Sequence, residues 1–351
     1  MAFSLAFVQN MRGLFPGICS KGVRMKRIFL VTITVLFAVS SQCAKGDGKP
    51  QLYPVVVEGK VGYVDNGGEL VIEPRFDRAL SFSEDLAAMR MDLKWGYIDE
   101  KGNTVIDPQF DFAGSFSEGM ADVRIGMRWG FIDKKGNVVI EPQYFAARAF
   151  SGGLAAVKIE NNWACIDKTG KIVIEPIFSF PVIFVEGMGA FWDGEKWGYI
   201  GKSGDSIIPP RFSLVGVFSE GRAPVALGGK WGFIDKQGRV VIEPRFDFAG
   251  PFTDGLAPVK IGEKWGFIDT MGDLSIGAEF DLAYIFLEDL APVRIGDKWG
   301  YINKSGEIVI EPQFTFPGHF SGGIAAVWET PQDRALIDKE GKIIWRSELK
   351  E

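Results

Sequence analysis

A tryptophan recurs along this chain with a constant spacing of 34 residues, and this period constrains the fold more than any other feature. A unit of this length cannot bury its own apolar faces, so neighbouring units must stabilise it. Val61 occupies the tryptophan position one period earlier, and Arg334 occupies it 35 residues after the last tryptophan, which gives nine units. The repeated tryptophans are Trp95, Trp129, Trp163, Trp197, Trp231, Trp265 and Trp299.

The segment "KWGFIDKQGRVVIEP", Lys230 to Pro244, predicts two strands joined by a tight turn. The glycine of its Asp-x-x-Gly segment is present in all nine units, as expected for a type I turn followed by a left-handed residue. We expect the aspartate, Asp235 here, to cap the turn with its carboxylate rather than to bind a metal ion. The proline ends the second strand because it has no N–H to donate.

A linker with two repeated aromatic positions follows, occupied here by Phe246 and Phe252. We expect these rings to be buried between units. A third strand, "LAPVKIG", then leads through a short turn into the next tryptophan strand. Cys165 stands where other units have Tyr or Phe, and we expect a buried thiol there.

We predict an all-β protein in which tandem three-stranded antiparallel meanders form an elongated superhelical array over residues 52–346. Nine units are many for a propeller, and 34 residues are few for a four-stranded blade. The alternative is a closed, propeller-like toroid. Leu52–Lys60 is a third strand without the first two, and Arg334–Trp345 is the first two without a third, so the chain ends together would complete one unit.

Register arithmetic assigns the tryptophans a structural role. A two-residue turn at Gly262–Glu263 places Lys260 opposite Trp265, and most other units pair a cation with the tryptophan in the same way. In the last unit Trp328 faces Arg334, so the pair is kept with its members exchanged. A ligand-stacking tryptophan would have no reason to change strands with its cation.

The other hairpin places a repeated glutamate opposite the tryptophan, as with Glu243 and Trp231. Lys230 is one step away, so we interpret this glutamate as a cross-strand charge partner rather than a catalytic acid.

The full unit "KWGFIDKQGRVVIEPRFDFAGPFTDGLAPVKIG" resembles the WG repeat, also called the KWG repeat in Leptospira. The resemblance covers Leu52 to Trp345, with Ala164 and Ala335 in place of the repeat glycine as departures. It implies a bacterial, β-rich repeat protein and implies no catalytic residues.

The amino terminus predicts export. Residues 25–43 combine Lys26 and Arg27 with about a dozen mostly apolar residues, as a signal peptide does. Cys43 suggests a lipoprotein-type cleavage site, and an ordinary signal peptide cut near Ser40 is the alternative. We interpret residues 1–24 as an over-long gene start, 44–51 as a linker and 347–351 as a tail. The expected location is the outer membrane as a lipoprotein, the periplasm or the medium.

Composition and motifs favour binding over catalysis. The net charge is −6 and there is one histidine, which disfavours nucleic-acid binding and histidine chemistry. We find no catalytic motif and expect no metal, no cofactor and no enzymatic activity, with membrane contact only through a lipid anchor. The predicted function is an interaction scaffold for a protein or envelope partner, and the alternative is glycan binding. The candidate surface residues are those where the repeat pattern breaks, Phe191, Trp192 and Trp328.

Overall fold

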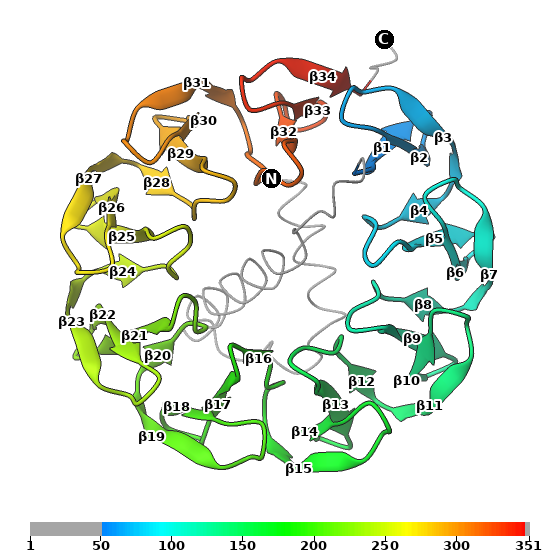
Figure 1. Ribbon diagram of the computed structural model, residues 1–351, viewed down its shortest axis with the longest axis horizontal. Coiled ribbons are helices and arrows are strands. Elements are labelled where there is room, and N and C mark those ends of the chain that lie inside the picture. Colours follow the sequence, from blue (N-terminus) through cyan, green and yellow to red (C-terminus); the bar gives the residue numbers. More distant parts are fainter. Residues whose placement is uncertain (1–50, 348–351) are drawn as a thin grey trace.

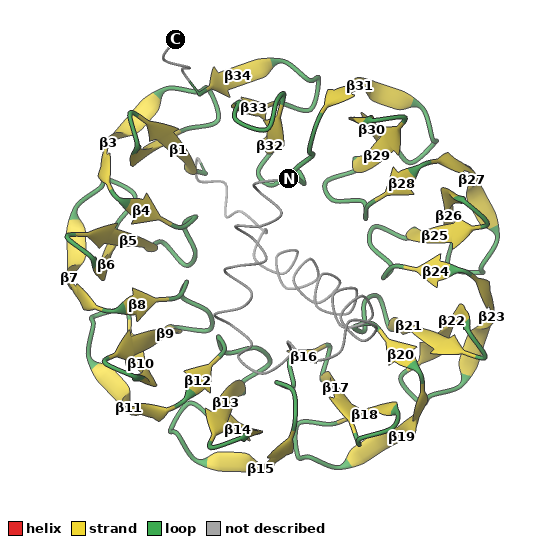
Figure 2. Cartoon of the chain, turned by 180° about the vertical axis from the view of Figure 1, so that it is seen from behind, coloured by secondary structure: helices red, strands yellow, loops and turns green. Residues whose placement is uncertain are grey.

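A computed structural model describes residues 51–347, and all regular secondary structure in this range is β-strand. The strands form nine separate antiparallel sheets, seven with four strands and two with three. Figure 1 shows the sheets arranged as blades of a closed ring around a common axis. Figure 2 shows the same strand and loop pattern from behind. The fold is therefore a nine-bladed β-propeller.

Each blade is a meander that runs outward from the axis, and the blades are numbered 1 to 9 in chain order. The short inner strands, present in blades 2 to 8, are β4 (Arg78–Ala79), β8 (Phe112–Ala113), β12 (Ala146–Ala147), β16 (Phe184–Val185), β20 (Leu214–Val215), β24 (Phe248–Ala249) and β28 (Leu282–Ala283). The second strands are β1 (Tyr53–Val57), β5 (Ala87–Met91), β9 (Met120–Ile125), β13 (Ala155–Ile159), β17 (Met188–Trp192), β21 (Arg222–Leu227), β25 (Ala257–Ile261), β29 (Ala291–Ile295) and β32 (Ala325–Trp328).

The third strands, which carry the repeat tryptophans, are β2 (Lys60–Val64), β6 (Lys94–Ile98), β10 (Arg128–Asp133), β14 (Asn162–Ile166), β18 (Trp197–Ile200), β22 (Lys230–Asp235), β26 (Lys264–Ile268), β30 (Lys298–Ile302) and β33 (Arg334–Ile337). The outer strands are β3 (Leu70–Phe76), β7 (Thr104–Phe110), β11 (Val138–Tyr144), β15 (Ile172–Phe178), β19 (Ser206–Phe212), β23 (Val240–Phe246), β27 (Leu274–Phe280), β31 (Ile308–Phe314) and β34 (Ile343–Arg346). The turns between second and third strands all lie on one face of the ring, which we call the tip face. The short connections from outer strands to the inner strand of the next blade lie on the same face.

The predicted elongated superhelical array is wrong, and the alternative of a closed toroid is confirmed. The reason lies in the linker, which contributes a fourth strand of only two residues, such as β8 (Phe112–Ala113). A blade can therefore have four strands within a 34-residue period.

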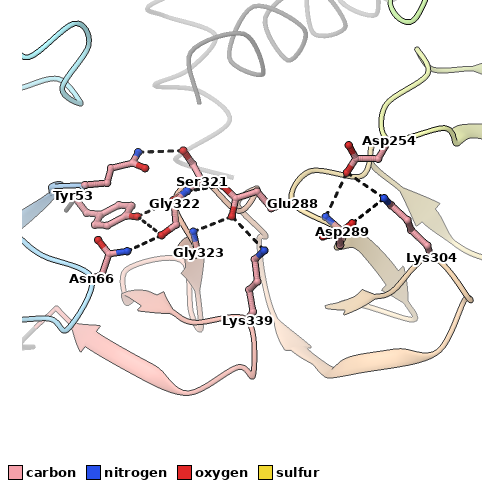
Figure 3. A network of polar contacts seen from close by, with 11 residues as sticks. Tyr53, Asn66, Asp254, Glu288, Asp289, Lys304, Ser321, Gly322, Gly323 and Lys339 are labelled. Atoms are coloured by element: carbon pink, nitrogen blue, oxygen red, sulfur yellow. Dashed lines mark hydrogen bonds and ion pairs between the residues drawn. The ribbon is translucent and has the colours of Figure 1, made fainter. Parts of the chain in front are cut away.

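The chain ends close the ring without sharing a sheet, so the expectation that they complete one unit is also wrong. Blade 1 is β1–β2–β3 and blade 9 is β32–β33–β34, each a separate sheet. The two blades pack through an apolar cluster that includes Val55, Ile324 and Leu336. The Tyr53 hydroxyl donates a hydrogen bond of 2.8 Å to the Ser321 carbonyl oxygen across this seam (Figure 3).

The core consists of apolar clusters between adjacent blades, as the repeated phenylalanines predict. The ring of Phe252 in blade 7 lies 4.8 Å from that of Phe233 in blade 6, and both are fully buried. The same contact recurs around the ring at Tyr63–Phe82, Tyr97–Phe116, Phe131–Phe150, Tyr199–Phe218, Phe267–Phe286 and Tyr301–Phe320. Cys165 replaces the ring of blade 4 and is a buried free thiol in the cluster of Phe184, as expected.

The Asp-x-x-Gly turn has the predicted geometry. The Asp235 Oδ1 atom accepts hydrogen bonds from the backbone N–H groups of Gln237 (3.0 Å) and Arg239 (2.9 Å). Gly238 has a φ of +79°, where a side chain would be strained, and an added Cβ would lie 3.1 Å from Ile208 of blade 5. The turn glycine therefore serves both the turn and the packing between blades.

The glycine after each tryptophan has a different cause. An added Cβ on Gly232 would lie 2.4 Å from the Ile242 carbonyl oxygen, because the outer strand crosses directly over this position. The crossing is a β-bulge that pairs Trp231 with Phe246 and Phe233 with Ile242. Glu243 is therefore not opposite Trp231, and that predicted pairing is wrong.

Acidic turns join the blades on the face opposite the tips. Glu118, between β8 and β9, accepts a hydrogen bond of 2.9 Å on Oε2 from the backbone of Gly153 in blade 4. Lys168 of blade 4 donates to the Glu118 carbonyl oxygen at 2.7 Å. Figure 3 shows the equivalent set between blades 8 and 9, formed by Glu288, Gly323 and Lys339.

Candidate interaction surfaces

The tip face has a repeated polar frame. The ammonium group of Lys230 contacts Asp247 Oδ1 at 2.6 Å, and the Gly262 backbone donates to Asp247 Oδ2 at 2.7 Å. The hydrogen bond from Lys230, followed by that from Gly262, lowers the pKa of Asp247. The same lysine–aspartate pair occurs at Lys60–Asp77, Lys94–Asp111 and Lys264–Asp281. The lysine's partner is thus the linker aspartate and not the repeated glutamate that the sequence favoured.

The tryptophans and cations pair in the predicted register. Lys260 is opposite Trp265, and Trp328 is opposite Arg334. The Arg334 guanidinium lies 5.7 Å from the Trp328 ring centroid. Trp95, Trp163, Trp231 and Trp299 are buried, and Trp129, Trp197 and Trp265 are half-buried. These rings pack within and between blades.

The linker residue two positions after the repeated aromatic joins the tryptophans of adjacent blades into an aromatic stripe. This residue was not identified from the sequence. Phe248 lies between the rings of Trp231 (5.1 Å) and Trp265 (5.3 Å), which belong to different blades. Phe112 joins Trp95 and Trp129 in the same way, at 5.6 and 5.2 Å. The sequence contains a signal for this position, because Phe recurs there while the other units carry Arg, Ala or Leu.

Phe191 and Trp192 are neighbours in sequence but have different surroundings. Phe191 is half-buried against the core, 5.8 Å from the ring of Phe178. Trp192 lies on the tip face beside Trp197, with ring centroids 5.5 Å apart, and Phe180 stacks on Trp197 at 6.0 Å. We call Phe180, Trp192 and Trp197 the blade 5 cluster.

Trp328 lies in blade 9, far around the ring from Trp192 in blade 5, so the two do not form one site (Figure 1). The exposed ring of Phe316 meets Trp328 edge-on at 5.5 Å. Among the predicted surface residues, only Phe191 and Trp192 lie on the same blade.

Of the two cysteines discussed above, the structure describes only Cys165. Cys43, the predicted lipidation site, lies outside the described residues. Cys165 is buried, and burial raises the pKa of its thiol to about 12. This thiol is protonated at neutral pH and shielded from reagents.

An open cleft of about 700 Å³ lies between blades 7 and 8 on the tip face. Its lining includes the cations Lys260, Lys264 and Arg294 beside Trp265. The acids Glu263, Asp281 and Asp297 line the same cleft, so its charges balance. In residues 51–347 no group of three His, Cys, Asp or Glu side chains is placed to hold a metal ion. No helix within that range is long and apolar enough to cross a membrane.

Closed blades, an aromatic stripe and a repeated charge frame define a repeat propeller. In a comparison of structures, a crystal structure of a eukaryotic initiation factor has a TM-score of 0.61 at 10% identity and covers 86% of this chain and 96% of its own. BamB from Moraxella catarrhalis has a TM-score of 0.44 at 12% identity, with coverages of 79% and 91%. Dihydro-heme d1 dehydrogenase NirN has a TM-score of 0.47 at 14% identity, with coverages of 87% and 74%. At 10% identity the likeness to the initiation factor concerns the fold alone.

The family model for the WG containing repeat matches eight tandem copies. The chain therefore belongs to the WG-repeat family, as the resemblance predicted. No curated protein matches this sequence. The matched segments are residues 62–95, 95–126, 129–163, 163–191, 197–231, 231–265, 265–299 and 299–327.

Proposed function

We propose that this chain is an exported, non-catalytic scaffold that holds a partner protein on its tip face at the blade 5 cluster. The observation that carries the proposal is a local loss of the polar frame. Asn162 replaces the frame lysine, Ser179 replaces the linker aspartate, and Trp192 replaces the cation beside the tryptophan. Half-buried aromatic rings where the repeated lysine–aspartate pair and the cation are lost are typical of protein-binding surfaces.

The propeller explains why such a cluster suits a scaffold. Adjacent blades are held together by the same buried ring contact, such as that of Phe252 with Phe233, and Trp192 takes no part in such a contact, so a substitution at Trp192 leaves it in place. The signal-like segment at residues 25–43 supports export, which cell fractionation with and without this segment tests.

Photo-crosslinking tests the docking site. We would place p-benzoylphenylalanine at Phe180 and, as a matched control, at the equivalent Phe248 of blade 7. With an envelope fraction we expect a defined cross-linked product from position 180 only. The product should disappear in Trp192→Lys, which installs the cation found at Lys158 and Lys260. Products that are equal at both positions, or none, would overturn the proposal. Deleting whole blades is unsuitable because the ring would not close.

Glycan binding is the second candidate, and the Trp192–Trp197 pair favours it. Two half-buried indoles with centroids 5.5 Å apart form a surface on which a sugar ring can stack. A glycan array separates the two functions: glycan binding predicts signals that fall in Trp192→Ala and, for a second site, in Trp328→Ala. An array without signals, or with signals that both variants retain, removes this candidate.

A further inference from the structure

Blade 3 lacks two tip-face acids of blade 7 although the two blades share the same strand register. Phe112, Arg124 and Trp129 of blade 3 correspond to Phe248, Lys260 and Trp265 of blade 7, four repeats later. In both blades the cation is paired with the tryptophan in the same register, and the phenylalanine contacts the same tryptophan. Met127, however, stands where blade 7 has Glu263, and Phe145 stands in the following linker where the later repeat has Asp281.

These two changes remove two of the three acids that balance the cations of the cleft. Asp281 contacts Lys264 at 2.8 Å, and Glu263 lies 3.6 Å from Lys260. In blade 3, the guanidinium of Arg128 stacks on the Phe145 ring at 3.7 Å. The guanidinium donates a hydrogen bond of 3.5 Å to the Gln143 carbonyl oxygen, and within residues 51–347 it forms no ion pair with a carboxylate. In the part of the chain that the structure describes, the positive charge of Arg128 therefore stacks on a ring instead of pairing with an acid.

Apolar side chains are exposed at these two positions and on the neighbouring blade. The side chain of Met127 is 85% exposed and that of Phe145 is 50% exposed. Leu93, at the tip of neighbouring blade 2, is 76% exposed. Phe112, at 36%, lies between the tryptophans of these two blades. We call Leu93, Phe112, Met127, Arg128 and Phe145 the Met127 patch.

Charge decides what this patch fits. The chain has a net charge of −6, so most of its surface repels an acidic partner. The cationic, apolar Met127 patch attracts one. A flat anionic membrane fits poorly, because the tips of the other blades would also meet it. Seven of the nine tips carry an acid, at Glu58, Asp92, Glu160, Asp193, Glu195, Glu263, Asp297, Glu329 and Asp333. A narrow segment would contact the patch and avoid most of these acids.

We propose that the Met127 patch is a docking site for an acidic segment of a partner protein that also carries apolar side chains. Its arginine contacts carboxylates, and Met127, Phe145 and Leu93 cover the apolar side chains. The site is separate from the blade 5 cluster. It rests on the proposed function only in that both treat the tip face as a binding surface.

The blades supply the test variants. Met127→Glu with Phe145→Asp installs the residues of Glu263 and Asp281, which the same frame already accommodates. The reciprocal variant, Glu263→Met with Asp281→Phe, builds a second patch between blades 7 and 8. The probe is a short fluorescein-labelled peptide of Glu, Asp, Phe, Leu and Ser. A peptide with Lys in place of the acids and vesicles of anionic phospholipid serve as comparisons, and thermal unfolding checks each variant's fold.

We expect the acidic peptide to bind wild type, with an affinity that falls as salt is added. Affinity should fall about tenfold or more in Met127→Glu with Phe145→Asp, and the reciprocal variant should show an added site. Equal binding of the lysine peptide, or unchanged binding in the first variant, overturns the proposal. Vesicle binding that the first variant abolishes, without peptide binding, would identify a membrane surface instead. Because the blade 5 crosslink uses other residues, its failure and the failure of this site are distinguishable.

Discussion

The hydroxyl of Tyr53 donates a hydrogen bond of 2.8 Å to the carbonyl oxygen of Ser321, 268 residues away, and so joins the first blade to the last. Every other junction between blades is also connected through the chain. Within residues 51–347 this junction is held by non-covalent contacts, including the 2.7 Å hydrogen bond from Asn66 to the Gly322 carbonyl oxygen (Figure 3). The seam is therefore the expected starting point for opening of the ring.

Tyr53→Phe should weaken the seam. The loss of one half-buried hydrogen bond costs about 1 kcal/mol and should lower Tm by about 2 °C. Hydrogen exchange should accelerate in blades 1 and 9 together, because both lose the same contact.

Tyr97→Phe is the matched control, since the Tyr97 hydroxyl donates to Gly114 at 2.8 Å between blades 2 and 3. It should cost a similar free energy without faster exchange in blades 1 and 9. Faster exchange in those blades in both variants, or in neither, would show that the seam is not the weak junction.

Glu118 combines an unfavourable backbone with a favourable contact. Its φ of +54° is unfavourable for a residue with a side chain, while its carboxylate holds Gly153 of the next blade. Glu118→Ala keeps the strain and loses the contact, so we expect a loss of about 1–2 kcal/mol. Glu118→Gly also loses the contact but relieves the strain, and should be more stable than the alanine variant by about 1 kcal/mol.

Urea unfolding of both variants measures this difference. Glycine already occupies the equivalent position at Gly152 and Gly322, so the glycine variant tests a residue that the fold accepts. Equal stabilities of the two variants would mean that the left-handed conformation costs nothing here.

The hairpin turns of the blade could be predicted from the sequence because their determinants are local. Asp235, Gly238 and the two-residue turn at Gly262–Glu263 fix the hairpins, and the register of Lys260 with Trp265 followed from the turn length. Ring closure could not be predicted in this way. It depends on the angle between adjacent blades, which results from how the buried rings of Phe233 and Phe252 pack, and a repeat pattern does not contain that angle.

The candidate sites were predicted less well for a related reason. Trp192 was identified because it departs from the repeat pattern, but its contact with Phe180 depends on how the linker folds back. Glu243 was placed opposite Trp231 because the β-bulge between Trp231 and Phe233 leaves no clear signal in the sequence. The arginine of the Met127 patch became informative only once the structure showed that the linker residue, Phe145, lies over it.

Gly232→Ala tests this bulge. The new Cβ would lie 2.4 Å from the Ile242 carbonyl oxygen, so the outer strand must shift, and we expect a loss of about 1–3 kcal/mol. Ala164 already occupies the equivalent position in blade 4, so Ala164→Gly is the informative partner variant. It should change stability far less if blade 4 has adjusted to its alanine. A neutral Gly232→Ala in thermal unfolding would show that the crossing strand yields freely.

His319 should make stability depend on pH. Burial beside the Tyr284 ring, 5.8 Å away, lowers the pKa of its imidazole from 6.5 to about 4. Between these values the unfolded chain binds a proton that the folded chain does not, so the stabilising contribution is complete above pH 6.5 and is lost as the pH falls towards 4. The total effect is at most about 3 kcal/mol.

His319→Ile, which installs the residue found at Ile285 one repeat earlier, should remove this loss. The variant should therefore gain stability relative to wild type between pH 6.5 and 4, as measured by urea unfolding at each pH. Because the chain has one histidine, its imidazole NMR signal gives the midpoint directly. A midpoint near 6.5 in the folded protein, or a stability difference that does not change with pH, would contradict a desolvated imidazole at this position.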